Sequence, residues 1–402
     1  MRSTLRLSLV LVLMLLAGAV TWGQRGAQEC TTAIFTAAAT PDGRPLLWKN
    51  RDTDTLSNKV VFVDDKPYSY LGVVNAEDTD GRMVWGGLNA AGLGIANSVA
   101  YNLPQRPGEQ ADLEGIIMAD ALRTCATVDQ VERYFAANLG PDLGSLANFL
   151  VIDAQGGASI FEVHNRGFKR IDATAAPQGY MANTNFSRTG TADQGAGYLR
   201  FDRETALLEA AAPRSYTPAF VLQTLARDLG HPLLGNPARE EWKSLPADRP
   251  LWVHTNHTIN RNSTASVLLV HGVKPGQHAR LATLWVILGE PVTGVAVPLW
   301  VAAGTPPAEL WEGKQAALTA EAFRLKDVLR PLKARERKEY ADLTRLDNAA
   351  GTGWLPSLLE AERDTLDQVD RLVAKNPQAA DLAAFQKAAA ERALALLRAT
   401  AR

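Results

Sequence analysis

Up to about residue 300, short apolar runs alternate with clusters of turn residues, which is the pattern of antiparallel β-sheet. Residues 31–35 and 45–48 are the first two runs, and Pro41-Asp42-Gly43 between them combines a fixed φ with a residue that accepts a positive φ. This spacing predicts a hairpin that returns residues 49–52 to the side of Cys30. The other runs that we expect to be strands are 60–63, 68–74, 83–87, 149–153, 159–163, 168–171, 251–257, 267–270 and 284–288.

Helical spacing of apolar residues replaces this alternation in 113–137, 199–211 and 217–227. Beyond Pro306-Pro307 the chain becomes rich in Ala, Leu, Glu, Arg and Lys, and helical spacing recurs in 355–373 and 382–397. We therefore expect a main domain over residues 30–305 and a helical C-terminal extension over 306–402. The extension is a candidate for packing, or for contact between copies in a homo-oligomer, rather than for catalysis.

The start of the chain has the organisation of a secretory leader, with a basic end, an apolar core and a small-residue segment. These parts are Arg2 and Arg6, residues 7–16, and Ala17-Gly18-Ala19. The core is too short for a membrane span. We therefore expect an exported protein, periplasmic or extracellular, that has no transmembrane span after processing.

Signal peptidase cleavage after Ala19, Gly23 or Ala27 would leave a stub that ends in Glu29. Residues 1–29 are thus predicted to be a signal peptide with a short propeptide, and removal of the stub needs either self-cleavage by Cys30 or another protease. Cleavage before Cys30 would give one residue both a thiol and a free α-amino group. Such an amine titrates at about 7.7–8.0, against about 10.4 for a lysine, so it can accept the thiol proton without a histidine.

Two other interpretations of Cys30 remain open. The chain has two cysteines, and an exported protein could join Cys30 to Cys125 in a disulfide. Cys125 lies in a stretch of helical spacing, however, where a buried thiol that acts as a small hydrophobe is the simpler interpretation. A bacterial lipoprotein would also have a cysteine here, but Ala27-Gln28-Glu29 lacks the small residue before the cysteine and the aliphatic residue three positions earlier.

Composition narrows the functional classes further. The 402 residues are 46% apolar and 21% charged, with a net charge of −1, so the electrostatic footprint of a nucleic-acid-binding protein is absent. The sequence contains no zinc-ligand spacing, G-x-G-x-x-G or phosphate-binding loop, and we expect no metal or other cofactor. His254 and His257 are interpreted as structural because the sequence offers no third ligand.

Three segments together resemble the mature start of N-terminal-nucleophile (Ntn) amide hydrolases: Cys30-Thr31-Thr32, the turn at 41–45 and Lys49-Asn50-Arg51-Asp52. The resemblance is greatest to the branch of isopenicillin-N acyltransferase and carcinine hydrolase, with bile salt hydrolases and penicillin V acylases as more distant relatives, and it covers roughly residues 30–303. It implies an α+β fold, a four-layer αββα sandwich, followed here by the helical extension. It also implies cleavage or transfer of an acyl group at a linear amide C–N bond, with a small N-acyl amide as substrate.

The resemblance carries roles to individual positions. Cys30 is implied to be the nucleophile and, through its amine, the base; Asp52 matches the aspartate that orients that amine, and Asn185 matches an asparagine that holds the oxyanion. Lys49 stands where bile salt hydrolases have an arginine, which a lysine cannot replace as a planar fork of donors.

Two further assignments are looser. The second oxyanion asparagine of bile salt hydrolases aligns with Val99, and Asn97 is the nearest amide; it is either that donor or a buried, hydrogen-bonded core group. Arg261 lies where the family has an active-site arginine, or is a surface residue. At the level of the whole protein, a catalytically silent Ntn-fold binding protein and a lipid-anchored surface protein remain alternatives to the enzyme.

Overall fold

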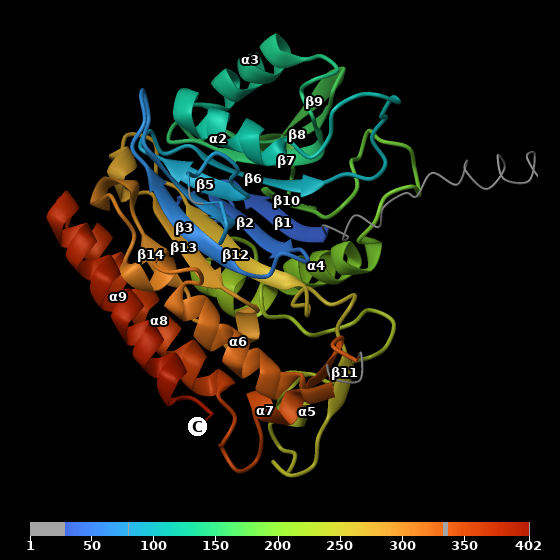
Figure 1. The fold of residues 1–402 in the computed structure, drawn as a ribbon, viewed down its shortest axis with the longest axis vertical. Coiled ribbons are helices and arrows are strands. Elements are labelled where there is room, and N and C mark those ends of the chain that lie inside the picture. The colour runs from blue at the N-terminus through green and yellow to red at the C-terminus, as the bar shows by residue number, and fades with distance from the viewer. Residues whose placement is uncertain (1–28, 79, 333–336, 402) are drawn as a thin grey trace, which may run out of the picture.

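Two antiparallel sheets lie face to face between two layers of helices in the computed structural model, which describes residues 29–78, 80–332 and 337–401 (Figure 1). Sheet A has six strands in the order β10-β1-β2-β12-β13-β14. They are β1 (Glu29–Phe35), β2 (Leu46–Asp52), β10 (Tyr180–Asn183), β12 (Thr264–His271), β13 (Thr283–Leu288) and β14 (Val297–Leu299). The predicted leader, residues 1–28, lies outside the described residues.

Sheet B is a seven-stranded meander in which neighbours in sequence are neighbours in the sheet. Its strands are β3 (Asn58–Val63), β4 (Tyr70–Asn75), β5 (Gly86–Asn89), β6 (Gly94–Val99), β7 (Leu146–Ile152), β8 (Ala158–His164) and β9 (Gly167–Asp172). A separate pair joins β11 (Trp252–His254) to β15 (Tyr340–Asp342). The expected strands are therefore all present, most with edges displaced by a few residues.

Helices cover the outer face of each sheet. On sheet B these are α2 (Glu114–Thr124) and α3 (Val128–Asn138), and on sheet A they are α4 (Tyr198–Ala210), η2 (Phe220–Leu225), α6 (Ala317–Leu329), α8 (Leu355–Val373) and α9 (Ala379–Ala399). The short elements are η1 (Ala173–Ala175), α5 (Arg239–Trp242), η3 (Ala279–Leu281), η4 (Pro291–Thr293), η5 (Val301–Ala303), η6 (Ala308–Leu310) and α7 (Leu343–Leu346). The predicted four-layer αββα arrangement with C-terminal helices is confirmed.

The stretch that we expected to form one helix at 113–137 is two helices. Cys125, directly after α2, has an extended backbone (φ −108°, ψ 143°), and Thr127 starts α3 by accepting a hydrogen bond from the amide of Gln130. A threonine in this position is a typical N-cap because its hydroxyl satisfies an amide that has no partner inside the helix. The run at 217–227 also differs in kind, since its centre is the π-helical η2.

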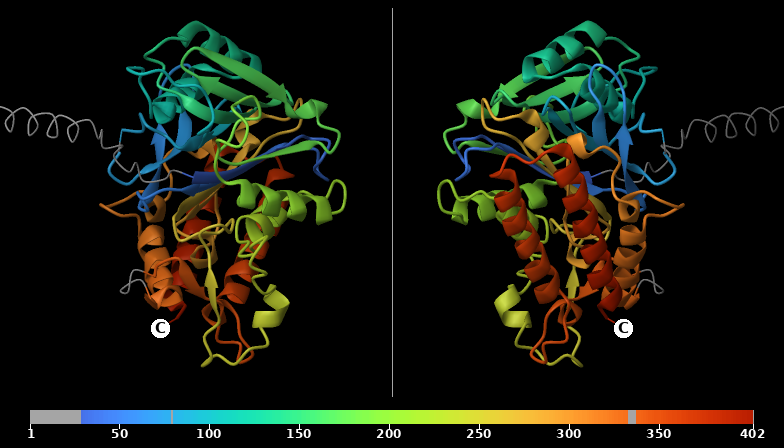
Figure 2. Two further views of the ribbon diagram at one scale, coloured as in Figure 1. Left: turned by 90° about the vertical axis from the view of Figure 1, so that its right-hand side faces the viewer. Right: turned by 90° about the vertical axis from the view of Figure 1, so that its left-hand side faces the viewer.

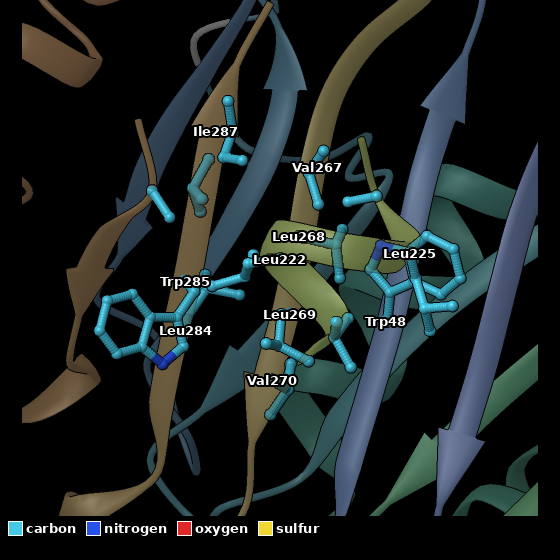
Figure 3. Packing of buried hydrophobic residues seen from close by; sticks show 14 of the residues in the cluster. Trp48, Leu222, Leu225, Val267, Leu268, Leu269, Val270, Leu284, Trp285 and Ile287 are labelled. Carbon is cyan, nitrogen blue, oxygen red and sulfur yellow. The ribbon is translucent and has the colours of Figure 1, made fainter. Parts of the chain in front are cut away.

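The C-terminal helices belong to the layer that covers sheet A. Figure 2 shows α8 and α9 side by side on this face, where α9 contacts β14 and α6 contacts β13. Figure 3 shows part of the core beneath, with side chains from β2, β12, β13 and η2, including Trp48, Trp285 and Leu225. Within the described residues, none of the helices combines the length and apolar character that crossing a bilayer requires.

The hairpin that starts sheet A fixes the geometry of the site. The turn predicted at residues 41–43 has Gly43 at φ +71°, and β1 and β2 pair so that Cys30 lies opposite Arg51 and Glu29 opposite Asp52. Since opposite residues share a face and successive residues alternate, Cys30, Arg51 and Lys49 face sheet B. Glu29 and Asp52 lie on the other face, toward α4.

Candidate active site

Cys30 is buried, and its backbone is held on both sides. Its amide nitrogen donates to Oδ1 of Asn185 at 2.9 Å, and its carbonyl accepts from Nη1 of Arg200 at 2.7 Å. Asn185 follows β10, the strand beside β1, and its Nδ2 donates to the carbonyl of Val99 at 2.9 Å. The nitrogen that would become the α-amine after cleavage therefore donates a hydrogen bond to the side-chain oxygen of Asn185, which the sequence predicted to be a site residue.

Arg200, on the first turn of α4, joins the segments around Cys30. It is fully buried and also donates to Thr31 Oγ1 at 2.8 Å, to Asn185 Oδ1 at 2.9 Å and to Glu29 Oε2 at 2.9 Å. Gly197 at the start of α4 has φ +79°, and a Cβ there would lie 2.6 Å from Arg200 Nη2. A glycine is thus required both by the backbone and by the close approach of the guanidinium.

The carboxylate of Asp52 lies on the α4 face, between a hydroxyl and a guanidinium. Oδ1 accepts from Thr264 Oγ1 at 2.7 Å, and Oδ2 lies 3.4 Å from Nη1 of Arg261. Burial raises the pKa of Asp52, and the neighbouring carboxylate of Glu29 adds to this, while Arg261 and Arg200 oppose it. Two residues that the sequence predicted to belong to the site, Arg261 and Asp52, are thus in contact. The side chain of Arg261 is mostly buried and does not lie on the open surface.

Glu29 is the second carboxylate of this cluster. Its Oε2 accepts from Arg261 Nη1 at 2.6 Å as well as from Arg200, and its side chain is 19% exposed. Burial opposes ionisation of Glu29, but the two guanidinium groups outweigh it and lower the pKa. Glu29 is therefore an anion that two arginines hold beside the peptide bond that joins it to Cys30.

The opposite face of the hairpin carries cations. Lys49 donates from Nζ to the carbonyl of Trp85 at 2.9 Å and to Asn97 Oδ1 at 2.6 Å, and burial lowers its pKa to about 8. The guanidinium of Arg51 lies 4.4 Å from the ring centre of Trp85, and burial lowers its pKa to about 9. A negative charge at Cys30 raises both pKa values, so both cations lie within electrostatic range of the Cys30 side chain.

Asn97 lies on β6, and its side-chain oxygen accepts the hydrogen bond from Nζ of Lys49. This hydrogen bond connects Asn97 to the site through Lys49. That its amide nitrogen donates to an oxyanion stays a prediction.

Cys30 and Cys125 are both free thiols, so the structure has no disulfide between them. Cys125 is packed in the core between sheet B and its helices, as expected for a buried hydrophobe, and burial raises its pKa.

Sequence reasoning missed Arg200 and the side chain of Glu29. The run 199–211 predicts a helix, but nothing in that spacing identifies which of its charged residues is buried against Cys30, because this depends on the packing of α4 on β10. The position of Glu29, directly before the proposed cleavage site, could have identified it.

A cavity of about 380 Å³ lies elsewhere, on the outer layer between α2 and α3, and none of these site residues lines it.

No family model and no curated protein sequence matches this chain. Solved structures do match it. They include a mutant conjugated bile acid hydrolase from Clostridium perfringens (13% identity, TM-score 0.39, 64% of this chain and 89% of that one) and an N-acylethanolamine-hydrolyzing acid amidase ortholog from Caenorhabditis elegans (14%, 0.41, 64% and 99%). Penicillin V acylase from Agrobacterium tumefaciens is a third (15%, 0.40, 67% and 86%). Bile salt hydrolases and penicillin V acylases, named above from sequence motifs, are thus also found by structure. Because the identities and TM-scores are low, the chemistry has to come from the site itself.

Proposed function

We propose that this protein is an exported amide hydrolase or acyltransferase whose nucleophile, Cys30, becomes the first residue of the mature chain. The observation that carries the proposal is the position of the Cys30 nitrogen, 2.9 Å from Asn185 Oδ1. A cut before Cys30 would leave an amine that already has a hydrogen-bond acceptor and belongs to the same residue as the thiol. Such an amine can act as the base for its own side chain.

Self-cleavage would use the same sulfur as catalysis, with the backbone nitrogen of Cys30 as the leaving group. The sulfur of Cys30 attacks the carbonyl carbon of Glu29, the C–N bond breaks as the C–S bond forms, and the thiol proton passes to the nitrogen. The products of this step are a thioester of Glu29 and a free α-amine. Water then cleaves the C–S bond, leaving a carboxylic acid on Glu29 and returning a proton to sulfur.

In the proposed catalytic cycle the α-amine takes the thiol proton and the sulfur attacks the amide carbonyl of the substrate. Asn185, with Asn97 as a second candidate, donates to the oxyanion, and loss of one such donor typically costs about 10²–10³ in turnover. The amine then gives its proton to the leaving nitrogen. Water releases the acyl group as an acid, or an acceptor amine takes it, so hydrolysis and transfer differ only in this last step.

N-terminal sequencing of the secreted protein, combined with turnover of chromogenic N-acyl amides, tests the proposal. We expect the active form to begin at Cys30, to take up one equivalent of a thiol reagent there and to lose activity as it does so. Cys30→Ala should have no turnover and, if cleavage is autocatalytic, should keep the stub. Cys30→Ser should mature in part but lose most turnover, because serine is the weaker nucleophile near neutral pH.

Cys125→Ala is the matched control, because it removes the other buried thiol at a position in the far core. It should mature and turn over substrate. An active form that begins upstream of Cys30, or an active Cys30→Ala variant, would contradict the mechanism. If the Cys30→Ala chain is still cleaved before residue 30, another protease performs the maturation. The role of Cys30 as nucleophile is then tested by whether this cleaved variant turns over substrate.

A further inference from the structure

The carboxylate of Glu29 occupies a site built by two arginines. Arg200 reaches Oε2 at 2.9 Å and Arg261 reaches it at 2.6 Å, and their side chains are 0% and 12% exposed. Arg200 also donates to Cys30, Thr31 and Asn185, and Arg261 also lies against Asp52. Both guanidinium groups are therefore fixed in place by the surrounding protein as well as by Glu29.

Removal of Glu29 would leave this site with too few negative charges. Two buried guanidinium groups would then have Asp52 as their remaining carboxylate partner, since burial raises the pKa of the neighbouring Glu204 well above its usual range and keeps that side chain neutral, and the new α-amine would lie close by. A buried charge without a partner is costly, so the mature site should recruit an anion. Among the described residues the Nε atoms of Arg200 and Arg261 have no hydrogen-bond partner, so each guanidinium has a donor beyond its present contacts.

The position of Glu29 indicates which part of a substrate would supply the anion. In the self-cleavage proposed above, the carbonyl of Glu29 becomes bonded to the sulfur of Cys30, and in catalysis the acyl carbonyl of the substrate takes that same bond. Three carbon atoms separate the carbonyl of a glutamate residue from its side-chain carboxylate. An acyl group with a carboxylate at the same separation is a glutaryl group.

We infer that Arg200 and Arg261 form the acyl-side specificity site of the mature enzyme, and that its substrates carry a carboxylate at the far end of a short acyl chain. This inference rests on the proposed function, since it needs cleavage before Cys30 and acylation of its sulfur. It assigns Arg200 and Arg261 a binding role, in addition to holding the segments around Cys30 and Asp52.

The test compares two substrates of the mature protein that differ only in charge. Glutaryl-4-nitroanilide carries the carboxylate, and its 4-carbamoylbutanoyl counterpart replaces it with a neutral amide of the same shape. We expect kcat/KM to favour the glutaryl compound by about tenfold or more, the size expected for a charge-assisted hydrogen bond. Arg261→Gln should reduce this ratio to near one, whereas Arg324→Gln, on the partly exposed face of α6, should leave it unchanged.

A binding measurement separates the two levels of the proposal. Glutarate should raise the melting temperature of the mature protein more than its neutral diamide does. Turnover of both substrates at equal rates would overturn the specificity site and leave the proposed function standing. Stabilisation by glutarate without turnover would keep the anion site and overturn the enzyme, and the absence of both effects would overturn both.

Discussion

Lys49 is a buried ammonium whose two hydrogen-bond acceptors, the Trp85 carbonyl and Asn97 Oδ1, are neutral. Burial lowers its pKa to about 8, and the charged groups that act on it are Cys30, Arg51, Asp52 and Glu114. Because the folded-state pKa is depressed, the ammonium is charged below about pH 8 and loses its proton above it. Its support for a thiolate at Cys30 is therefore present below about pH 8 and lost as the pH rises through that value.

We expect this loss to appear as the alkaline limb of the pH profile of kcat/KM. Lys49→Arg should move the limb to higher pH, since a guanidinium keeps its charge there. Lys326 provides a comparison, because burial also lowers its pKa to about 8 but its contacts are Glu290 and the carbonyl of Asn262, beside Arg261 rather than on the face of the hairpin that carries the Cys30 side chain. Lys326→Arg should leave the limb in place, and an unmoved limb in Lys49→Arg would exclude Lys49 as its source.

Glu29 allows maturation to be separated from catalysis. In Glu29→Gln the two arginines lose a carboxylate, and a charge-assisted hydrogen bond is worth about 1.5–3 kcal/mol. If these contacts hold the scissile segment in place, maturation should slow by about tenfold or more, which mass spectrometry of the N-terminus over time would measure. Glu321→Gln, which removes a partly exposed carboxylate paired with Arg324, should mature at the normal rate.

The mature molecules from wild-type and Glu29→Gln precursors have the same covalent structure if cleavage falls before Cys30. Their turnover per mature molecule must then be equal. A difference in specific activity between the two would show that residue 29 remains in the working protein. Equal maturation rates would remove Glu29 from the cleavage step without affecting the assignment of Cys30.

What the sequence predicted at the level of residues depended on proximity along the chain. Cys30, Lys49 and Asp52 belong to one hairpin, so a recognisable turn was enough to predict that they lie close together, whereas the structure shows that Asp52 is on the opposite face from Lys49. Asn185 and Arg261 came from the resemblance alone. Arg200 was not found, because a buried arginine on an amphipathic helix has no distinguishing spacing and its partners are all in other elements.

Elements far from Cys30 along the chain hold the segment that presents Arg261. Asn260 donates to Glu290 Oε1 at 2.8 Å, and Glu290 is paired with Arg330 just after α6 at 2.6 Å. The ammonium of Lys326 on α6 donates to the carbonyl of Asn262. A helix of the C-terminal extension therefore positions a residue of the candidate site, which the composition of the extension did not predict.

A second buried ion pair fixes α8 to the same layer. Arg227 donates to both oxygens of Glu362 at 2.9 Å, and Glu362 also accepts from the amide of Ala296. Glu362→Ala should lower the free energy of unfolding by about 3–5 kcal/mol, because it leaves a buried guanidinium without its partner. Urea denaturation would measure this loss.

Glu360→Ala is the control on the same helix, since Glu360 is exposed and its removal should change the free energy of unfolding by about 0.5 kcal/mol or less. Equal effects of the two substitutions would mean that the pair contributes nothing beyond helix propensity.

The boundaries of α8 were predicted from sequence because its apolar stripe is regular. The residue that pairs with Glu362 could not be predicted in this way. Arg227 is more than a hundred residues away along the chain, and only the fold brings it to α8.

At the scale of the whole molecule, one apolar core extends through sheet A into the C-terminal helices. Trp48 and Trp285 of the sheet belong to the same buried cluster as Leu325, Leu358 and Leu394. Sequence composition separates residues 306–402 from the rest, because amphipathic helices and mixed strands differ in residue usage. Composition does not report which sheet face such helices cover, so the shared core had to come from the structure.

A chain that ends after Thr305 should therefore fail to fold as a soluble monomer. It would uncover the face of sheet A that α6, α8 and α9 occupy, and would leave Glu290 and Arg227 without Arg330 and Glu362. Large exposed apolar faces and unpaired buried charges favour aggregation and unfolding. Size-exclusion chromatography and thermal melting would test this, and co-expression of residues 306–402 as a separate chain should restore solubility if packing is the cause. A truncated chain that is monomeric, melts cooperatively and retains full turnover would show instead that residues 30–305 are an independent domain.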